Sequence, residues 1–346
     1  MALPVPRGIE PMLARLSDDI PRGEGWLYEP KWDGFRALIY RDGDVVELVS
    51  RNGQPLNRYF PELIAPLQAA LPPRCVVDGE IVITAGAKLD FEALLLRIHP
   101  AASRVTKLAR ELPASFVAFD LLGLGDDDLR GQPLSKRWPL LKKALRPGAH
   151  VWLTPQSDDP DVAQRWLTEF EAQGMDGVVA KRPEQRYEPG ERVMVKIKRV
   201  HTADCVIGGY RKAQKGTGIG SLLLGIYADD GGLRHVGHTS AFPAKQRQEL
   251  QALLTPLEGG SGFVEGHAPG GPSRWSRGRD MSWIPVQPKL VCEVAFDRLV
   301  NGKFRHAGRF VRWRPDKKPA ECTFAQFEKQ PRVQRPFWED ASRSAR

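Results

Sequence analysis

The segment Lys31-Trp32-Asp33-Gly34-Phe35-Arg36 could do chemistry, because it places a lysine at a predicted strand end just before a turn. A lysine is a nucleophile only as the neutral amine, and nearby cations or removal from water favour that form. Taken alone, such a segment is more often a surface turn with a solvated lysine. The hypothesis that Lys31 forms a covalent intermediate therefore depends on the residues that come later in the chain.

Six further segments with charged or aromatic residues follow Lys31 in order. They are Ser50-Arg51-Asn52-Gly53, Asp78-Gly79-Glu80, Phe119-Asp120, Asp176-Gly177-Val178-Val179-Ala180-Lys181, Val195-Lys196-Ile197-Lys198 and Arg312-Trp313-Arg314-Pro315-Asp316-Lys317-Lys318. Lys196 and Lys198 alternate by two on a predicted strand, so both side chains should face one side. Two such cations could hold a phosphate and favour the neutral form of Lys31.

In their order and spacing, these segments resemble the covalent nucleotidyltransferase superfamily, and specifically the ATP-dependent DNA ligases. The resemblance extends over about 290 residues, from Lys31 to Lys318. Residues 96–105, 119–141 and 309–323 look most like the compact ligase C type of bacterial enzyme, which consists of the catalytic core alone. The resemblance implies that nicks with a 5′-phosphate and a 3′-hydroxyl are sealed through lysyl-AMP and AMP-DNA.

The resemblance also implies which residues act in the first step. Lys31 would attack the α-phosphorus of ATP and expel pyrophosphate, with Lys196 and Lys198 at the α-phosphate. Arg314 and Lys317 would swing in to orient the leaving pyrophosphate. Positive charge around the polyphosphate is what this reaction requires. Without the other segments, residues 312–318 would be interpreted as a solvated basic stretch.

Nucleotide and metal binding follow from the same resemblance. The residues implied to bind the nucleotide are Glu29, Arg36, Arg51, Glu80, Phe119, Lys181, Lys196 and Lys198. Phe119 would stack on the purine, and Glu29 would accept a hydrogen bond from the adenine amino group. Glu80 and Asp176 would bind Mg²⁺, with Mn²⁺ as an alternative, since hard cations prefer oxygen ligands.

Two positions depart from the family pattern. Asp176 stands where the family usually has Glu, and the shorter side chain could make metal coordination water-mediated. Met194 stands where related enzymes often have an aromatic residue. Both departures leave the expected metal geometry open.

The distribution of charge favours a polyanionic partner. The net charge is +9, and residues 1–200 carry 28 basic and 28 acidic side chains, whereas residues 201–346 carry 23 and 14. A segregated basic surface suits nucleic acid, although a basic solvated face is the alternative. We expect nicked duplex DNA to contact residues that include Arg211, Lys212, Lys215, Arg274, Arg277 and Arg279.

An α+β fold with two domains is expected. Short runs rich in β-branched and aromatic residues predict strands over 28–40, 45–50, 75–84, 115–122, 176–182 and 193–198, the first two joined by a turn at Asp42-Gly43. Helical spacing predicts helices over 61–70, 91–98, 136–145 and 161–173. Together with the resemblance, this pattern indicates an adenylation domain of antiparallel sheets and helices over residues 1–200.

After residue 200 the sequence changes to strands and turns. Strands are expected over 204–210, 221–228, 233–240, 290–299 and 303–315, with one helix over 243–254. This pattern predicts an OB-fold β-barrel over residues 201–330, followed by a tail over 331–346. Residues 216–221 are interpreted as a hairpin turn, and 259–273 as a mobile loop. The hinge between the domains should lie near Arg199 to Ala203.

The composition limits the class of protein to which the chain can belong. Hydrophobic residues at 41% and charged residues at 27% are typical of a globular chain. The four cysteines form no CxxC pair, which favours reduced thiols in a cytosolic protein. No stretch approaches the roughly 18 uninterrupted apolar residues of a membrane helix, so no membrane segment is expected. We expect a cytoplasmic, nucleoid-associated monomer that acts in DNA repair, either end joining or gap repair, beside an end-binding protein and a separate primase-polymerase. An RNA ligase and a catalytically inactive nucleic-acid-binding relative are the alternatives.

Overall fold

The computed structural model describes residues 2–264, 266, 268–269, 281–327 and 336. The chain divides after Arg199 into two compact units. Each unit has its own sheets and its own hydrophobic core, so each is described by itself.

The larger sheet of the first unit has seven strands. Its strands are β3 (Phe35–Asp42), β4 (Val45–Ser50), β5 (Arg74–Ala85), β6 (Lys88–Leu89), β7 (Ala114–Leu124), β8 (Asp127–Asp128) and β9 (Val151–Leu153). The main order is β4-β3-β5-β7-β8, while β6 pairs with β5 and β9 pairs with β7. All of these pairs are antiparallel except β7 with β9. The predicted hairpin at Asp42-Gly43 is confirmed, and Gly43 has the positive φ of 62° that such a turn needs.

A second sheet of four strands stands beside the first. Its strands are β1 (Leu13–Ser17), β2 (Leu27–Pro30), β10 (Val178–Lys181) and β11 (Arg192–Ile197), in the order β1-β11-β10-β2. The strand predicted over 28–40 is therefore wrong as one element, because its two halves belong to different sheets. The chain crosses between the sheets at residues 31–34.

Backbone contacts explain this crossing. The Lys31 N–H donates to the Gly177 carbonyl, and the Asp176 N–H donates to the Lys31 carbonyl, at 2.8 and 2.9 Å. Gly34 then passes so close to β5 that a β-carbon there would lie 2.1 Å from the Ile81 carbonyl oxygen. Only glycine fits this approach, so the turn after Lys31 is fixed by tertiary contact rather than by local propensity.

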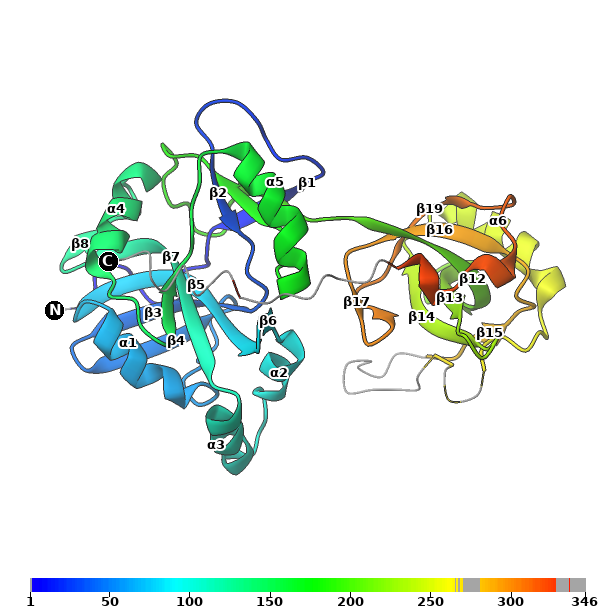
Figure 1. Cartoon of the computed structure of the whole chain (residues 1–346), viewed down its shortest axis with the longest axis horizontal. Helices are drawn as coiled ribbons and strands as arrows, with labels where there is room; N and C mark the ends of the chain where they lie inside the picture. Colours follow the sequence, from blue (N-terminus) through cyan, green and yellow to red (C-terminus); the bar gives the residue numbers. More distant parts are fainter. Residues whose placement is uncertain (1, 265, 267, 270–280, 328–335, 337–346) are drawn as a thin grey trace. The chain divides into compact units, whose positions relative to one another are not determined.

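Helices pack around the sheets of the first unit (Figure 1). They are η1 (Pro61–Leu63), α1 (Ile64–Ala70), α2 (Phe91–Leu96), α3 (Ala102–Glu111), α4 (Leu134–Ala144), α5 (Pro160–Glu169) and η2 (Phe170–Gln173). The four predicted helices are present, and the predicted 161–173 helix ends as a 3-10 turn at Gly174, where φ is 90°. The sequence pattern did not predict α3, which buries only Val105 and Ala109.

The core of the first unit lies on the helix-covered face of the large sheet. Ile39, Val77 and Phe116 from three neighbouring strands pack there against Leu67 of α1 and Leu141 of α4. All five side chains are essentially removed from solvent. Burial on this scale holds β3, β5 and β7 rigid, and these strands carry several of the expected site residues.

The second unit is a curled sheet of six strands. Its strands are β12 (His201–Lys212), β13 (Ile219–Tyr227), β14 (Leu233–Ser240), β15 (Ile284–Pro285), β16 (Val291–Phe296) and β19 (Arg309–Trp313). The order is β14-β13-β12-β16-β19, with β15 on β12. Thr239 at the end of β14 bridges to Gly308 just before β19, which brings the two edges of the sheet together. The second unit therefore has the predicted OB-fold barrel.

The remaining elements of the second unit are small. They are α6 (Ala244–Leu254), η3 (Thr255–Leu257), β17 (Leu299–Val300), β18 (Lys303–Phe304), η4 (Pro319–Glu321) and η5 (Phe324–Gln326). The predicted helix is present as α6. Residues 213–218 join β12 to β13, which confirms the hairpin interpretation of the glycine-rich segment. Part of the predicted 259–273 loop, and all but residue 336 of the predicted tail, lie outside the described residues.

All four cysteines are free and buried, as Cys75, Cys205, Cys292 and Cys322. Among the described residues, no helix is both long and apolar enough to cross a membrane.

Candidate active site

A pocket of about 210 Å³ opens in the first unit between its two sheets. Strands of both sheets line it, together with the crossing at residues 31–34. The expected site residues in its wall are Glu29, Lys31, Arg36, Arg51, Glu80, Phe119, Lys181 and Lys196. Segments spread over more than 160 positions of the sequence therefore meet around one cavity.

Lys31 lies at the pocket wall in a cluster of alternating charges. Its Nζ is 2.5 Å from Asp176 Oδ2, and Lys198 Nζ is 2.9 Å from the same oxygen. Burial alone would raise the pKa of Asp176, but the two lysines outweigh it and hold that pKa below its usual value. Asp176 thus stays ionised and keeps both cations beside the pocket.

Lys196 lines the pocket from β11, and Lys198 follows one residue after the end of that strand. Removal from water lowers the pKa of Lys196, and the positive charges of Lys31 and Lys198 lower it further. The three amines therefore lie close enough to influence one another through their charges. A polyphosphate entering the pocket would relieve the repulsion.

Glu29 is a buried carboxylate that is held from two sides. Lys181 Nζ lies 2.7 Å from its Oε2, and Gln156 Nε2 donates to its Oε1 at 3.0 Å. Burial raises the pKa of Glu29, against the opposing attraction of Lys181. Lys181 also lies 4.9 Å from the centre of the Phe119 ring, so the acceptor and the aromatic face share one cation.

Glu80 projects from β5 into the same pocket. Burial raises its pKa to about 8, although Lys31 and Arg36 oppose the shift. A carboxyl group with a raised pKa releases its proton when a cation binds. Glu80 could therefore serve as an oxygen ligand for a divalent metal. Among the described residues, no group of three or more His, Cys, Asp or Glu side chains gathers into a metal site.

Arg36 and Arg51 complete the wall and differ in burial. Arg36 pairs with the fully buried Asp78 through two hydrogen bonds of 2.6 and 3.0 Å, and its guanidinium lies 5.2 Å from the centre of the Phe119 ring. Arg51 follows β4 and is exposed. Arg36 is thus fixed before any ligand binds, whereas Arg51 is accessible to one.

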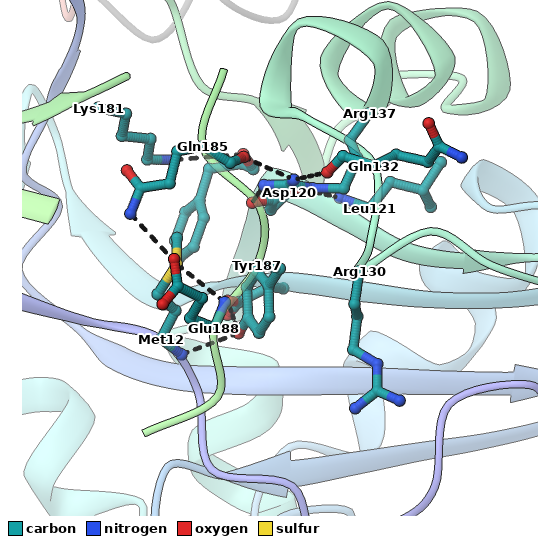
Figure 2. A network of polar contacts seen from close by, with 12 residues as sticks. Met12, Asp120, Leu121, Arg130, Gln132, Arg137, Lys181, Gln185, Tyr187 and Glu188 are labelled. Atoms are coloured by element: carbon teal, nitrogen blue, oxygen red, sulfur yellow. Dashed lines mark hydrogen bonds and ion pairs between the residues drawn. The ribbon is translucent and has the colours of Figure 1, made fainter. Parts of the chain in front are cut away.

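A buried network of hydrogen bonds and ion pairs holds the backbone beside the pocket (Figure 2). Asp120 of β7 forms two hydrogen bonds of 2.8 Å with Arg137 of α4, and these side chains are 2% and 0% exposed. Arg137 also donates to the Gln132 and Gln185 carbonyls. Because Asp120 directly follows Phe119, the network fixes the backbone that carries the aromatic ring.

The second unit holds the two remaining candidates. Arg314 Nη1 lies 2.8 Å from Asp204 Oδ1, and Lys317 Nζ lies 2.7 Å from Asp204 Oδ2. Arg314 also pairs with Asp316 at 2.8 Å. The structure therefore brings these two cations together on one carboxylate, within their own unit.

Several neighbours of the site were not predicted. Gln156, Asp78 and Asp204 each contact an expected site residue, Tyr187 donates to Asp78, and Arg192 lines the pocket. Only Asp78 belongs to one of the six segments after Lys31, and no role was predicted for it there. The others carry no local signal, because each is brought to the site by tertiary packing.

A lysine in a cation-rich pocket, with an acceptor carboxylate and an aromatic face nearby, has the parts of a covalent nucleotidyltransferase. The expected acidic residue Asp176 directly contacts the lysine, and Met194 is buried in the pocket wall. Of the two departures from the family pattern, Met194 lies in the pocket wall and Asp176 lies beside the pocket, against Lys31.

Comparison with known proteins supports this class. The family profile described as "ATP dependent DNA ligase domain" matches residues 11–198, and "ATP dependent DNA ligase C terminal region" matches residues 215–317. The chain is 49% identical to "DNA ligase C" of Mycobacterium tuberculosis over 95% of this chain and 96% of that protein. It is 33% identical to "Multifunctional non-homologous end joining DNA repair protein LigD" of the same species, over 86% of this chain and 37% of that protein.

A solved structure agrees in fold. The structure entitled "DNA binding with a minimal scaffold: Structure-function analysis of Lig E DNA ligases" matches with a TM-score of 0.54 at 20% identity, over 88% of this chain and 99% of that one. The chain belongs to the ATP-dependent DNA ligase family, with an adenylation domain followed by an OB-fold domain. Within that family it is of the compact ligase C type.

Proposed function

We propose that the chain seals nicks in duplex DNA with Lys31 as its nucleophile. The observation that carries this proposal is the contact of Lys31 with Asp176 at the wall of a pocket that Lys196 also lines. In the first step the neutral Nζ attacks the α-phosphorus of ATP and an N–P bond forms. The bond to pyrophosphate breaks and its electron pair leaves with pyrophosphate. The ammonium of Lys31 loses one proton to water before the attack, and the second amine proton passes to water as the N–P bond forms.

Lys196 and Lys198 would hold the α-phosphate during this step, because both lie in the charge cluster around Lys31. Glu80 and Asp176 would hold Mg²⁺, or Mn²⁺, together with phosphate oxygens of the nucleotide. Such a cation neutralises phosphate charge as the leaving group departs. The position of Glu80 in the pocket wall, with Lys31 nearby, supports this assignment.

Adenine would be recognised at the inner end of the pocket. Glu29 accepts from the exocyclic amine, and Phe119 stacks on the purine face. Lys181 orients both groups, since it contacts Glu29 and faces the Phe119 ring. The sugar would be held by Arg36, Arg51 and Glu80. A carboxylate acceptor disfavours guanine, which presents a carbonyl in place of that amine.

Arg314 and Lys317 would orient the departing pyrophosphate. They belong to the OB-fold domain, so this role requires the domains to close for step one and to open for DNA, with a hinge near residues 199–203. The proposal assigns residues 1–200 to adenylation, 201–330 to the barrel and 331–346 to a tail. Division of the chain after Arg199 supports the first boundary.

In the second and third steps AMP moves to the 5′-phosphate, and the 3′-hydroxyl then displaces it. Arg211, Lys212 and Lys215 would contact the duplex, Lys212 and Lys215 being exposed at the hairpin after β12. Arg274, Arg277 and Arg279 lie outside the described residues. With 6 to 10 phosphate contacts, affinity would fall by roughly 10³ to 10⁵ between low and physiological salt.

The cellular role would be DNA repair in the cytoplasm, at the nucleoid. The name of the LigD relative refers to end joining, which supports this role and a partnership with an end-binding protein and a primase-polymerase. The enzyme would work as a monomer.

A nick-sealing assay tests the proposal. The protein, ATP and Mg²⁺ are mixed with a nicked duplex that carries a 5′-phosphate, and with matched RNA and RNA-DNA nicks. We expect sealing of DNA through transient AMP-DNA, and none by Lys31→Ala. Preferential sealing of RNA would favour an RNA ligase, whereas binding without sealing would identify an inactive relative.

A further inference from the structure

Asp204 is the shared partner of the two cations assigned to pyrophosphate. Its two oxygens are divided between them, Oδ1 to Arg314 Nη1 at 2.8 Å and Oδ2 to Lys317 Nζ at 2.7 Å. The Asp204 side chain is only 12% exposed, against 19% and 26% for its partners. One buried carboxylate therefore sets the separation and direction of both cations.

Asp204 is itself rigidly placed. It lies in β12 opposite Glu293 of β16. The Gln326 side chain also binds both of its backbone groups, since the Asp204 N–H donates to Gln326 Oε1 at 2.8 Å and Gln326 Nε2 donates to the Asp204 carbonyl at 3.2 Å. An acceptor fixed at its backbone can hold flexible partners in one geometry.

The segment that carries the cations is fixed at its backbone as well. The Arg314 N–H donates to the Val291 carbonyl at 2.8 Å, and the Lys317 N–H donates to the Arg314 carbonyl at 3.1 Å. This turn presents both side chains to Asp204. The second carboxylate on Arg314, Asp316, is 60% exposed and more readily replaced by solvent or by a ligand.

We infer that Asp204 is a positioning residue for formation of the lysyl-AMP, acting through Arg314 and Lys317. The inference rests on the proposed function of those two residues at the leaving pyrophosphate. Long cationic side chains lose rotamer freedom when they bind a phosphate, and Asp204 imposes that order beforehand. Once a polyanion displaces the exposed Asp316 from Arg314, one carboxylate against two cations leaves a net positive charge. Asp204 travels with the cations, because all three belong to the same unit.

The test separates the reaction steps in the full-length protein. Asp204→Asn keeps the shape of the side chain and removes its charge. We expect its maximal single-turnover rate of label transfer from α-labelled ATP to fall at least tenfold, with little change in the ATP concentration at half-maximal rate. Sealing of a pre-adenylylated nick, which needs no pyrophosphate departure, should stay within twofold of wild type. Asp204→Glu should recover part of the lost rate.

Asp230→Asn is the matched control. It is the same substitution in the same unit, at an aspartate whose side chain is 61% exposed and which pairs with Arg234. Both reactions should stay within twofold of wild type in this variant. Damage to the barrel as a whole would slow sealing of the pre-adenylylated nick together with label transfer, and an equal loss of both in Asp204→Asn would overturn the inference.

Arg314→Ala and Lys317→Ala separate this inference from the proposed function. If both variants take label at the wild-type rate, the pyrophosphate role of these cations is wrong and the inference falls with it. If both lose label transfer while Asp204→Asn keeps it within twofold, or gains rate, only the inference about Asp204 is wrong.

Discussion

Replacing Asp120 by Asn should destabilise the adenylation domain by an amount that follows from its burial. Asn keeps the shape of the side chain but leaves the Arg137 guanidinium, which is 0% exposed, without its counter-charge. Removing one partner of such a pair costs about 3 to 5 kcal/mol. For a domain of this size, the loss corresponds to a decrease in Tm of roughly 6 to 20 °C.

Scanning calorimetry of the full-length protein measures this decrease. Asp128→Asn is the matched control, because Asp128 pairs with Arg130 at the surface with a side chain 38% exposed, and its loss should cost at most about 1 kcal/mol. The double variant Asp120→Asn with Arg137→Met should recover part of the loss, since it removes the unpaired charge. A Tm of Asp120→Asn within about 2 °C of wild type would refute the reasoning.

Three further predictions concern the barrel and the pocket. Burial, with Lys303, Arg211 and His238 nearby, lowers the pKa of His235 to about 4. The folded protein thus favours the neutral imidazole. The free energy of unfolding should therefore be highest above pH 6.5 and should decrease by up to about 3 kcal/mol as the pH falls towards 4. His235→Leu should flatten this part of a denaturation-against-pH curve, and an unchanged slope would contradict the assignment. Gln156→Leu removes one of the two donors to Glu29, and should raise the ATP concentration for half-maximal adenylylation about tenfold, with exposed Gln164→Leu as control. Glu80→Ala should lower Mg²⁺-dependent label transfer at least about 100-fold, and retention of the wild-type rate at low Mg²⁺ would exclude Glu80 as a metal ligand.

The sequence predicted the residues that line the pocket better than the residues that hold them in place. Lys31, Glu80 and Lys196 were predicted because each lies in a segment whose order along the chain matches a family, and all three line one cavity. Gln156 and Asp204 lie in no such segment. Their contacts exist only after distant strands pack together, so no local pattern could reveal them.

The errors in secondary structure have a similar cause. Residues 28–40 resemble one strand because aromatic residues, which favour strands, stand on both sides of the turn, as Tyr28 before it and Phe35 and Tyr40 after it. The break at residues 31–34 depends on hydrogen bonds to Asp176 and Gly177, far along the chain. Helix α3 was missed because most of its residues are polar and it buries only Val105 and Ala109, although these two follow the four-residue spacing of one helix face.

Label transfer tests the central claim most directly. The protein is first treated with pyrophosphate to remove bound AMP, then mixed with Mg²⁺ and α-labelled ATP or GTP, denatured and analysed for labelled peptide. The account predicts label from ATP alone, on the peptide that contains Lys31, and none in Lys31→Ala. Equal label from GTP would contradict the assignment of Glu29 to adenine, and label retained in Lys31→Ala would contradict the nucleophile itself.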